Sequence, residues 1–522
     1  MHSGVFRKRA SALLGGALFA LFFAFGRQME HDGASDPALA MAAALTIPFA
    51  LILTALFERV WRRLFTQREL AGGACRPFRA RMAFVALFAC YVPMLLVTFP
   101  GSFAYDVPFQ LRQVFTGEYS THHPLLHTLL LGGCVALGRA LGEINLGAAL
   151  YTVLQMAGMA ACFALTCASI ARRCGARAAR LSAAFFALYP LHMLFAVNAT
   201  KDVLFSGAFA LALALAAEAA EGESAPRGLF AGFTAACTAA MLLRNNAVYA
   251  VAVWMLLQLP ALRRRQGRLL LLSAAISVGL ALGTGALLAR VTEAVSGDMS
   301  EMLSVPIQQL ARARLMEGEK LTDEERETID ALMPGEAWRA YDPSISDPVK
   351  FAFDTEAMKA DMGAAVSTYL SVLKKCPKAY LDALLALTYP FFYPYGEYRV
   401  SGYYLQMGIS EEQLDQWCDF PYITSQSLFP RVRDSLAWRF GAKGAMQIPV
   451  VGYLFNMGAI VWVMLFFALR DVYRGRWRRA GVWLLPVLLW GTFLLGPVMA
   501  GRYIYPFVCV LPVMGSEKED RS

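Results

Sequence analysis

The stretch PGSFAYDVPFQLRQVFTGEYSTHHPLLHTLL, residues 100–130, separates two apolar segments and is rich in polar and ionisable side chains. These side chains are Asp106, Gln110, Arg112, Glu118, His122, His123 and His127. A bilayer core offers such groups no water, so the stretch is too polar to lie inside a membrane. Functional residues concentrate on loops that a rigid scaffold holds in place. We therefore expect the loop 100–123 to form the floor of a functional site.

The rest of the chain is apolar enough to place that loop at a membrane surface. The 522 residues are 57% hydrophobic and 17% charged, with a mean hydropathy of +0.46. Apolar blocks of about 16–24 residues recur, the length that crosses a hydrocarbon core roughly 30 Å thick. The candidate spans are residues 10–26, 38–57, 83–99, 124–140, 148–171, 181–197, 203–219, 228–243, 247–262, 269–290, 447–469, 480–496 and 503–515. The sequence predicts an all-α polytopic membrane protein of about 11–13 transmembrane helices.

The basic residues indicate the orientation of these spans. The net charge is +9, and Lys and Arg cluster in short loops between apolar segments. A nucleic-acid interface would need a basic face on a soluble domain, so we expect no nucleic-acid partner. Cytoplasmic loops are enriched in Lys and Arg. The loops expected there carry Arg59, Arg62, Arg63, Arg68, Arg76, Arg79 and Arg81, then Arg263, Arg264, Arg265 and Arg268, then Arg470, Arg474, Arg476, Arg478 and Arg479. Both termini are then cytoplasmic in a cell-membrane protein.

One basic loop conflicts with a simple count of crossings. The loop 172–180 is also basic, yet three apolar segments separate it from the earlier basic loop. We expect the segment 124–140 to be re-entrant or tilted, which restores the topology. The polar stretches 100–123, 198–202, 244–246, 291–446 and 501–503 then all fall on the external side. Five polar stretches on one side predict a shared external cavity.

These boundaries divide the chain into three parts. Residues 1–290 form an N-terminal transmembrane module, 291–446 an external helical region, and 447–522 the C-terminal transmembrane helices with a short tail. In the external region, Thr322–Glu325 predicts a capping box and Pro334–Gly335 a helix stop. Further helices are expected from Asp347 toward Lys375 and from Ser410, and Tyr389–Tyr395 resembles an interfacial segment. Cys376 and Cys418 either pair or remain free thiols.

Asp106 and the histidines are the first candidates for chemistry. Asp106 can accept a proton from a hydroxyl, or it can cap the helix that Pro108 begins. His123 and His127, four residues apart, share one helix face. They could bind zinc, donate to a phosphate or cap a helix. Zinc needs three or four ligands, and only Asp106 or Glu118 could complete the set, so contact with a phosphate or hydroxyl is favoured. A divalent cation remains a possible cofactor.

Cations at the ends of apolar segments complete the candidate site. Lys201-Asp202 lies at one such junction, where a snorkelling lysine is the alternative interpretation. Arg244 precedes two asparagines inside an apolar run, and charges at that depth usually face an internal cavity. Arg502, before Tyr503, is either an interfacial anchor or a ligand for phosphate oxygens. A carboxylate among these cations suits a substrate whose leaving group is a lipid phosphate.

At these residues the chain resembles the GT-C superfamily of membrane glycosyltransferases, which use polyprenyl-phosphate sugars. In that superfamily the first external loop carries a catalytic acid followed by a helix that starts at proline, as Asp106 and His122-His123-Pro124 do here. Arg502-Tyr503-Ile504-Tyr505-Pro506 is similar to the Arg-Tyr-x-x-Pro of protein mannosyltransferase-like members. Tyr105 departs from the pattern, because many members have a second acid beside the first.

A nearer resemblance, which covers most of the chain, is to an uncharacterised bacterial family of multispan proteins. The stretches that carry it are Tyr105-Asp106, His-His-Pro-Leu-Leu-His-Thr at 122–128 and Val305-Pro-Ile-Gln-Gln309.

The superfamily resemblance implies inverting transfer of a sugar from a polyprenyl-phosphate donor to an extracytoplasmic acceptor, with Asp106 as general base. The implied substrate-binding residues are Tyr105, Gln110, His122, His123, Lys201, Asp202, Arg244, Asn245, Arg502 and Tyr503. A transporter or lipid flippase is the main alternative, although no internal repeat is visible and the ionisable groups lie at one interface. A non-catalytic membrane assembly protein is the third hypothesis.

Overall fold

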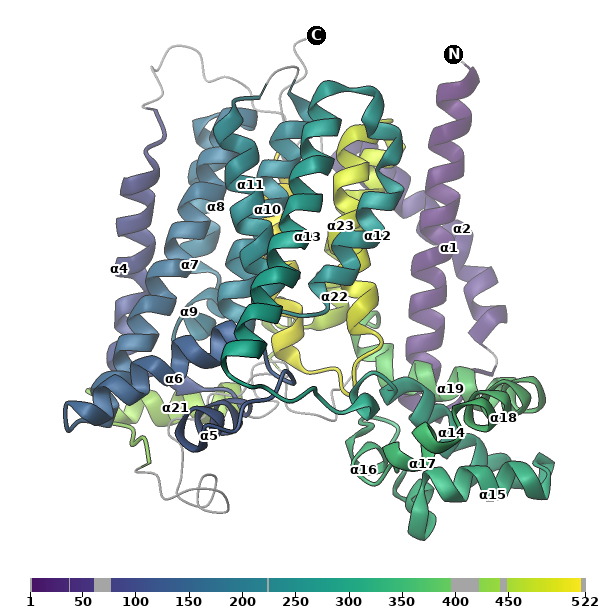
Figure 1. Cartoon of the computed structure of the whole chain (residues 1–522). Coiled ribbons are helices and arrows are strands. Elements are labelled where there is room, and N and C mark those ends of the chain that lie inside the picture. Colours follow the sequence, from purple (N-terminus) through teal and green to yellow (C-terminus); the bar gives the residue numbers. More distant parts are fainter. Residues whose placement is uncertain are drawn as a thin grey trace.

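The computed structural model describes residues 2–36, 38–60, 77–222, 225–395, 422–441 and 448–517. Figure 1 shows a bundle of long helices with a layer of shorter helices at one end. The helices of the bundle are α1 (His2–Asp32), α2 (Ala38–Ala55), α4 (Ala80–Thr98), α7 (Ile144–Cys174), α8 (Ala176–Leu188), α9 (Pro190–Ala196), α10 (Lys201–Glu221), α11 (Arg227–Leu243), α12 (Ala247–Leu257), α13 (Arg265–Val291), α22 (Met457–Tyr473), α23 (Trp477–Phe493) and α24 (Tyr505–Gly515). The N-terminus of α1 and the C-terminus of α24 both lie on the side of the bundle opposite that layer.

The prediction of an all-α polytopic fold is confirmed. Six helices in the described ranges are long and apolar enough to cross a membrane, or seven if α8 and α9 form one bent span. The other expected spans are shorter helices of the same bundle, such as α11 with 17 residues and α12 with 11. At 1.5 Å per residue, an 11-residue helix extends only about 16 Å, roughly half of a hydrocarbon core. The predicted span 247–262 therefore stops early, at Leu257.

The predicted straight span 181–197 is broken. α8 and α9 meet at an angle of 60°. The break falls at Tyr189, whose backbone is extended with ψ 124°, because Pro190 follows it at the start of α9. The ring of a proline disfavours helical geometry in the residue before it. This break turns the chain toward the end of the bundle that carries the polar loops.

The segment 124–140, which we expected to be re-entrant or tilted, forms α6 (Leu125–Ala140), with 16 residues. Figure 1 shows α6 at an angle to the long helices, at the bundle end where α5 (Val107–Thr116) and α21 (Pro430–Gly441) also lie. Its second half packs on α7, and Gly138 meets Gly147 so closely that a Cβ on either residue would clash with backbone. The two glycines therefore let the two helices approach at backbone distance.

Small residues also bring the central helices together. The buried residues of α10 include Ala208, Ala210, Ala212, Ala214, Ala216, Ala217 and Ala219. Neighbouring helices can approach such an alanine-rich helix closely, which is how membrane helices gain van der Waals contact. α7, α11 and α24 all pack against α10. The first residue of α10, Lys201, is thereby fixed at the polar end of the bundle.

The layer at the polar end is formed by α14 (Ser304–Glu317), α15 (Asp323–Leu332), α16 (Asp347–Lys350), α17 (Thr355–Ala360), α18 (Met362–Lys375) and α19 (Pro377–Thr388). It has its own hydrophobic core, which includes Ile329, Trp338 and Tyr380. The capping box at Thr322 and Glu325 is confirmed, and α15 ends at Leu332 before Pro334 as predicted. The helix expected from Asp347 is instead three helices, because Asp354 and Asp361 each cap a new start.

Two further expectations concern this region. The tyrosines of 389–395 were expected at headgroup level, yet Tyr389 and Tyr393 are buried and only Tyr395 is largely exposed. The segment packs between α1 and α22, where Trp462 donates to the carbonyl of Phe392. Cys376 is buried as a free thiol. Cys418 and the helix start expected at Ser410 lie outside the described residues.

Short backbone pairings join the polar loops to one another. The two-residue strands β1 (Ser102–Phe103) and β2 (Asn198–Ala199) pair in parallel, which brings the loop after α4 beside the start of α10. Isolated bridges pair Ser120 with Val295 and Ile345 with Val498. Segments from four distant parts of the sequence therefore meet at this end of the bundle.

Candidate functional site

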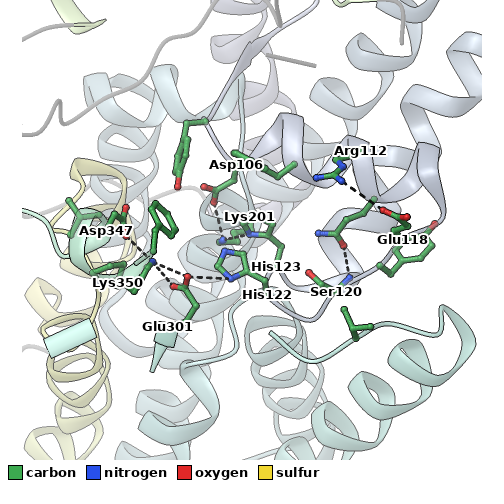
Figure 2. A pocket seen from close by; sticks show the side chains of 18 of the residues that line it. Asp106, Arg112, Glu118, Ser120, His122, His123, Lys201, Glu301, Asp347 and Lys350 are labelled. Atoms are coloured by element: carbon green, nitrogen blue, oxygen red, sulfur yellow. Dashed lines mark hydrogen bonds and ion pairs between the residues drawn. The ribbon is translucent and has the colours of Figure 1, made fainter. Parts of the chain in front are cut away.

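A polar pocket of about 870 Å³ lies where these loops meet. It is lined by Tyr105, Asp106, Phe109, Arg112, Gln113, Gly117, Glu118, Tyr119, Ser120, His122, His123, Lys201, Glu293, Val295, Glu301, Asp347, Lys350, Phe351, Pro497, Val498, Arg502 and Tyr503. Figure 2 shows two groups of charged side chains facing this pocket, one around Asp106 and one around Lys350. The predicted shared cavity thus has a counterpart in the fold.

Asp106 is positioned by backbone on both sides. β1 ends three residues before it, and α5 begins at the residue after it, with Pro108 in its first turn. Within the described α5, the carboxylate accepts no hydrogen bond from the first turn, so the capping interpretation is wrong. The side chain instead points toward the start of α10, where Thr200 caps the helix and Lys201 follows. The carboxylate is therefore held for interaction with side chains.

Asp106 is part of a buried chain of alternating charges, here called the ionic chain. Lys201 Nζ donates to Asp106 Oδ2 at 2.9 Å, and Arg502 Nη2 donates to Asp106 Oδ1 at 3.0 Å. Arg502 Nε lies 3.5 Å from Asp202 Oδ2, and Asp202 in turn pairs with Arg244. The order is Lys201, Asp106, Arg502, Asp202, Arg244. Three cations and two carboxylates leave one positive charge.

The far end of the ionic chain is packed against aromatic rings. The Arg244 guanidinium carbon lies 4.1 Å from the ring centre of Phe493 and 4.7 Å from that of Tyr503. Its Nε donates to Asn246 at 3.1 Å. Stacking on ring faces stabilises a guanidinium that has lost its water. Arg244 is thus held behind the pocket wall, where it pairs with Asp202 and stacks on Tyr503, a residue of the pocket lining.

The ionic chain fixes the charge state of Asp106. The side chain is almost wholly buried, and burial by itself raises the pKa of a carboxyl group. Arg502 and Lys201 outweigh that effect and hold the pKa of Asp106 well below its usual range. The carboxylate is therefore ionised at neutral pH. The Nε and Nη1 atoms of Arg502 have no hydrogen-bond partner among the described residues, although both are buried.

The three histidines have different surroundings. His123 Nδ1 lies 3.2 Å from Lys201 Nζ. The ring of His122 packs edge-on against the ring of His123, with the ring centres 4.5 Å apart. His127 faces away from the pocket, 3.0 Å from the Gln110 amide and 2.6 Å from the Tyr151 hydroxyl. Spacing along a helix put His123 and His127 on one face, but α6 begins only at Leu125.

A second charged group, here called the Lys350 cluster, faces the pocket from the side of the layer of short helices. Lys350 Nζ lies 2.8 Å from Glu301 Oε1 and 2.8 Å from Asp347 Oδ1. Glu301 Oε1 is also 4.0 Å from His122 Nδ1. Sequence reasoning missed this cluster. Asp347 and Lys350 are three residues apart on one helix, which was a usable signal, but nothing local connects them to Glu301.

The predicted substrate-binding residues divide into two groups. Tyr105, Asp106, His122, His123, Lys201, Arg502 and Tyr503 line the pocket. Gln110, Asp202, Arg244 and Asn245 do not line it. Gln110 bonds His127 and Thr128, and Asn245 donates to the carbonyl of Thr121 in the loop behind the pocket. Only the residues of the first group are therefore placed to contact a ligand in the pocket directly.

The zinc alternative finds no ligand set in the described ranges. No group of three or more His, Cys, Asp and Glu side chains there has the geometry to hold a metal ion. His123 faces a lysine ammonium and His127 is committed to Gln110 and Tyr151.

Acid should destabilise the fold through His123. Burial, assisted by Lys201, lowers the pKa of His123 well below 6.5, and Asp106, His122 and Arg502 are its other charged or titratable neighbours. The unfolded histidine titrates near pH 6.5, so the unfolded state binds more protons below that pH and stability falls. We expect the melting temperature in detergent to drop from pH 7 to pH 5, and to drop less in His123→Gln. His31→Gln, at an exposed position, should match the wild type. An equal drop in His123→Gln would contradict the assignment.

Comparison with known proteins gives one finding. The model of a family of unknown function, DUF6020, matches residues 115–517. No curated protein and no solved structure matches the chain. The match includes Lys201, Arg244 and Arg502, whereas Asp106 lies before its first residue. It agrees with the nearer of the two resemblances and carries no information on glycosyl transfer. Since it covers most of the chain, the protein belongs to the DUF6020 family.

Proposed function

We propose that this protein is a membrane glycosyltransferase that moves a sugar from a polyprenyl-phosphate donor to an extracytoplasmic acceptor with inversion. The observation that carries the proposal is the ionic chain, with its uncompensated positive charge and with Arg502, which lines the pocket and whose Nη1 has no partner among the described residues. A planar guanidinium with a free N–H is well suited to phosphate oxygens. A pocket at the end of a membrane bundle allows the lipid to remain in the bilayer while its phosphate reaches Arg502.

In the reaction, the acceptor hydroxyl oxygen forms a bond to the anomeric carbon as the bond from that carbon to the phosphate oxygen breaks. Asp106 receives the hydroxyl proton, and the phosphate leaves with the bonding electrons. Arg502 and Lys201 stabilise the negative charge that develops on the leaving phosphate, as preorganised cations do for developing anions. His122 and His123 border the same space and would contact the sugar or the phosphate.

The low pKa of Asp106 fits this scheme only if the donor changes its surroundings. In the empty site Lys201 and Arg502 each hold one carboxylate oxygen, which makes Asp106 a weak base. An incoming phosphate competes for both cations. As they turn toward the phosphate, Asp106 loses the contacts that depress its pKa, and its affinity for a proton rises. In the empty site, Asp106 thus binds the two cations that would bind the phosphate of the donor.

The direct test is to incubate the purified protein in detergent with a panel of polyprenyl-phosphate sugars and candidate acceptors. Release of lipid phosphate together with transfer of the sugar is the expected result. A donor that binds but is not consumed, and that crosses the bilayer of liposomes containing the protein, would instead indicate a flippase. Absence of both binding and turnover across the panel would leave the ionic chain as a structural element and would overturn the proposal.

Arg502→Lys should separate charge from geometry at the donor site. Lysine retains the charge but not the planar fork, so it cannot contact Asp106, Asp202 and a phosphate at once. We expect the Kd for the donor to rise about 10–100-fold, the equivalent of losing a hydrogen bond to a charged group. Arg290→Lys, at an exposed arginine outside the pocket lining, is the matched control and should bind normally. Equal donor affinity in both variants would contradict a phosphate-binding role.

A further inference from the structure

The wall of the pocket opposite the ionic chain carries the opposite net charge. The Lys350 cluster has two carboxylates, Glu301 and Asp347, and one ammonium, which leaves one negative charge. The Lys350 side chain is only 4% exposed, whereas those of Glu301 and Asp347 are 27% and 19% exposed. The lysine therefore fixes both carboxylates in place while their remaining lone pairs stay accessible. A negative wall disfavours a second anionic ligand here.

Aromatic rings are exposed inside the same pocket. Phe351 is 74% exposed, Tyr105 49% and Phe109 44%. All three belong to the lining of the cavity. Rings left open to water in a pocket are typical of ligand-binding surfaces, because a ligand that covers them gains apolar contact. A ligand with apolar C–H faces and hydroxyl edges would cover the rings and donate hydrogen bonds to the carboxylates.

The two histidines connect the two walls. His123 Nδ1 is 3.2 Å from Lys201 on the side of the ionic chain, and His122 Nδ1 is 4.0 Å from Glu301 on the other side. Figure 2 shows both rings between Asp106 and Glu301. Arg502, which is more than nine-tenths buried and whose Nη1 has no partner among the described residues, belongs to the lining of the same pocket. A ligand on the Lys350 cluster is thus adjacent to the donor's phosphate site.

We propose that the Lys350 cluster and Phe351 form an acceptor subsite for a neutral, hydroxyl-rich molecule, a saccharide. Sugar hydroxyls donate to Glu301 and Asp347, and the C–H face of the sugar ring packs on Phe351. This proposal rests on the proposed function, because it names the acceptor of that reaction. It also predicts that the site binds a saccharide in the absence of the donor.

The experiment combines binding with kinetics on the full-length protein. Ligand-observed NMR in detergent, with panels of neutral, acidic and amino saccharides, is expected to show binding of neutral members to the wild type. Glu301→Gln should weaken that binding about 10–100-fold, as the loss of a hydrogen bond to a charged group does. Phe351→Ala should weaken it as well, because the C–H face of the sugar loses its apolar contact. With an active donor they should raise the KM for the acceptor and leave the Kd for the donor unchanged. Phe351 is largely exposed, so its replacement places little burden on folding.

Matched controls in the same layer are Met316→Ala and Glu356→Gln. Met316 is 60% exposed outside the pocket, and Glu356 forms an exposed ion pair with Lys359. Both should behave as the wild type. Saccharide binding that both test variants lose, without any transfer, would support the subsite and count against the transferase. Transfer with an unchanged acceptor KM in Phe351→Ala and Glu301→Gln would overturn the subsite alone. No saccharide binding to the wild type, with or without donor, would overturn it as well.

Discussion

Replacing Asp106 by asparagine is expected to lower kcat for sugar transfer by about 10²–10⁴-fold, the usual contribution of a positioned general base, and to tighten donor binding at the same time. The first effect follows because asparagine has the shape of aspartate but cannot accept the hydroxyl proton. The second follows because Lys201 and Arg502 would lose the carboxylate with which the phosphate otherwise competes for these two cations. Single-turnover transfer measured beside the equilibrium Kd of the donor separates the two effects.

Asp382→Asn is the matched control for Asp106→Asn. Asp382 is also a buried carboxylate, 3.5 Å from Arg312 and 3.1 Å from Lys378, but it lies in α19 outside the pocket lining. Its replacement should disturb folding in a comparable way while kcat and the donor Kd remain those of the wild type. A folded Asp106→Asn protein with a normal transfer rate would remove the base from the mechanism. A fall in kcat with weakened donor binding would mean that Asp106 orders the two cations and does not compete with the phosphate.

The polar residues that interrupt apolar segments were the informative part of the sequence. Asp106, Lys201 and Arg502 each carry charge at the end of an apolar run, and such charges are costly unless they meet partners. Because an unpaired charge there is so costly, charged residues that lie hundreds of positions apart in the sequence were expected to meet in one cavity. The pairing order could not be predicted in the same way. Whether Arg244 contacts the pocket or the second carboxylate depends on a few ångströms of side-chain packing against Phe493 and Tyr503.

Local sequence patterns predicted the features that depend on one short segment, but they did not predict the features that depend on contacts between distant segments. Thr322 and Glu325 satisfy each other's backbone groups within one helical turn, so the capping box could be predicted. The Lys350 cluster depends on how the layer of short helices contacts the bundle, through the pairing of Ile345 with Val498. Hydropathy likewise identified apolar segments but not their direction. Pro190 bends one of them, and the loop 100–123 ends in a helix that lies across the bundle end.

Asp202→Asn should have the largest effect on stability of any single change at the site. Asp202 is fully buried between Arg502 Nε, 3.5 Å away, and Arg244. Removing one member of a buried ion pair typically costs about 3–5 kcal/mol, because the remaining charge is left without compensation. Here two guanidinium groups would lose their shared carboxylate. We expect a lower free energy of unfolding in detergent, measured by thermal or denaturant unfolding, and a lower yield of folded protein.

The same variant should also impair the donor site, although Asp202 does not line the pocket. Asp202 attracts the Arg502 guanidinium, with Oδ2 3.5 Å from Nε, while Nη2 donates to Asp106 and Nη1 has no partner among the described residues. Without Asp202, Arg502 can turn two nitrogens toward Asp106, which leaves fewer donors for a phosphate. Glu221→Gln is the matched control, since it breaks the ion pair with the buried Arg173 at the opposite end of the bundle. It should lower stability and leave the donor Kd unchanged.

A double-mutant cycle with Arg244→Gln distinguishes positioning from stability alone. If Asp202 acts by holding both arginines, the two changes share one network, and their effects on the free energy of unfolding should be coupled by about 0.5–3 kcal/mol. The donor Kd should be raised by Asp202→Asn in either background, because Arg502 loses its anchor in both. Additive stability effects, together with a donor Kd equal to that of Glu221→Gln, would show that Asp202 and Arg244 support the fold without orienting Arg502.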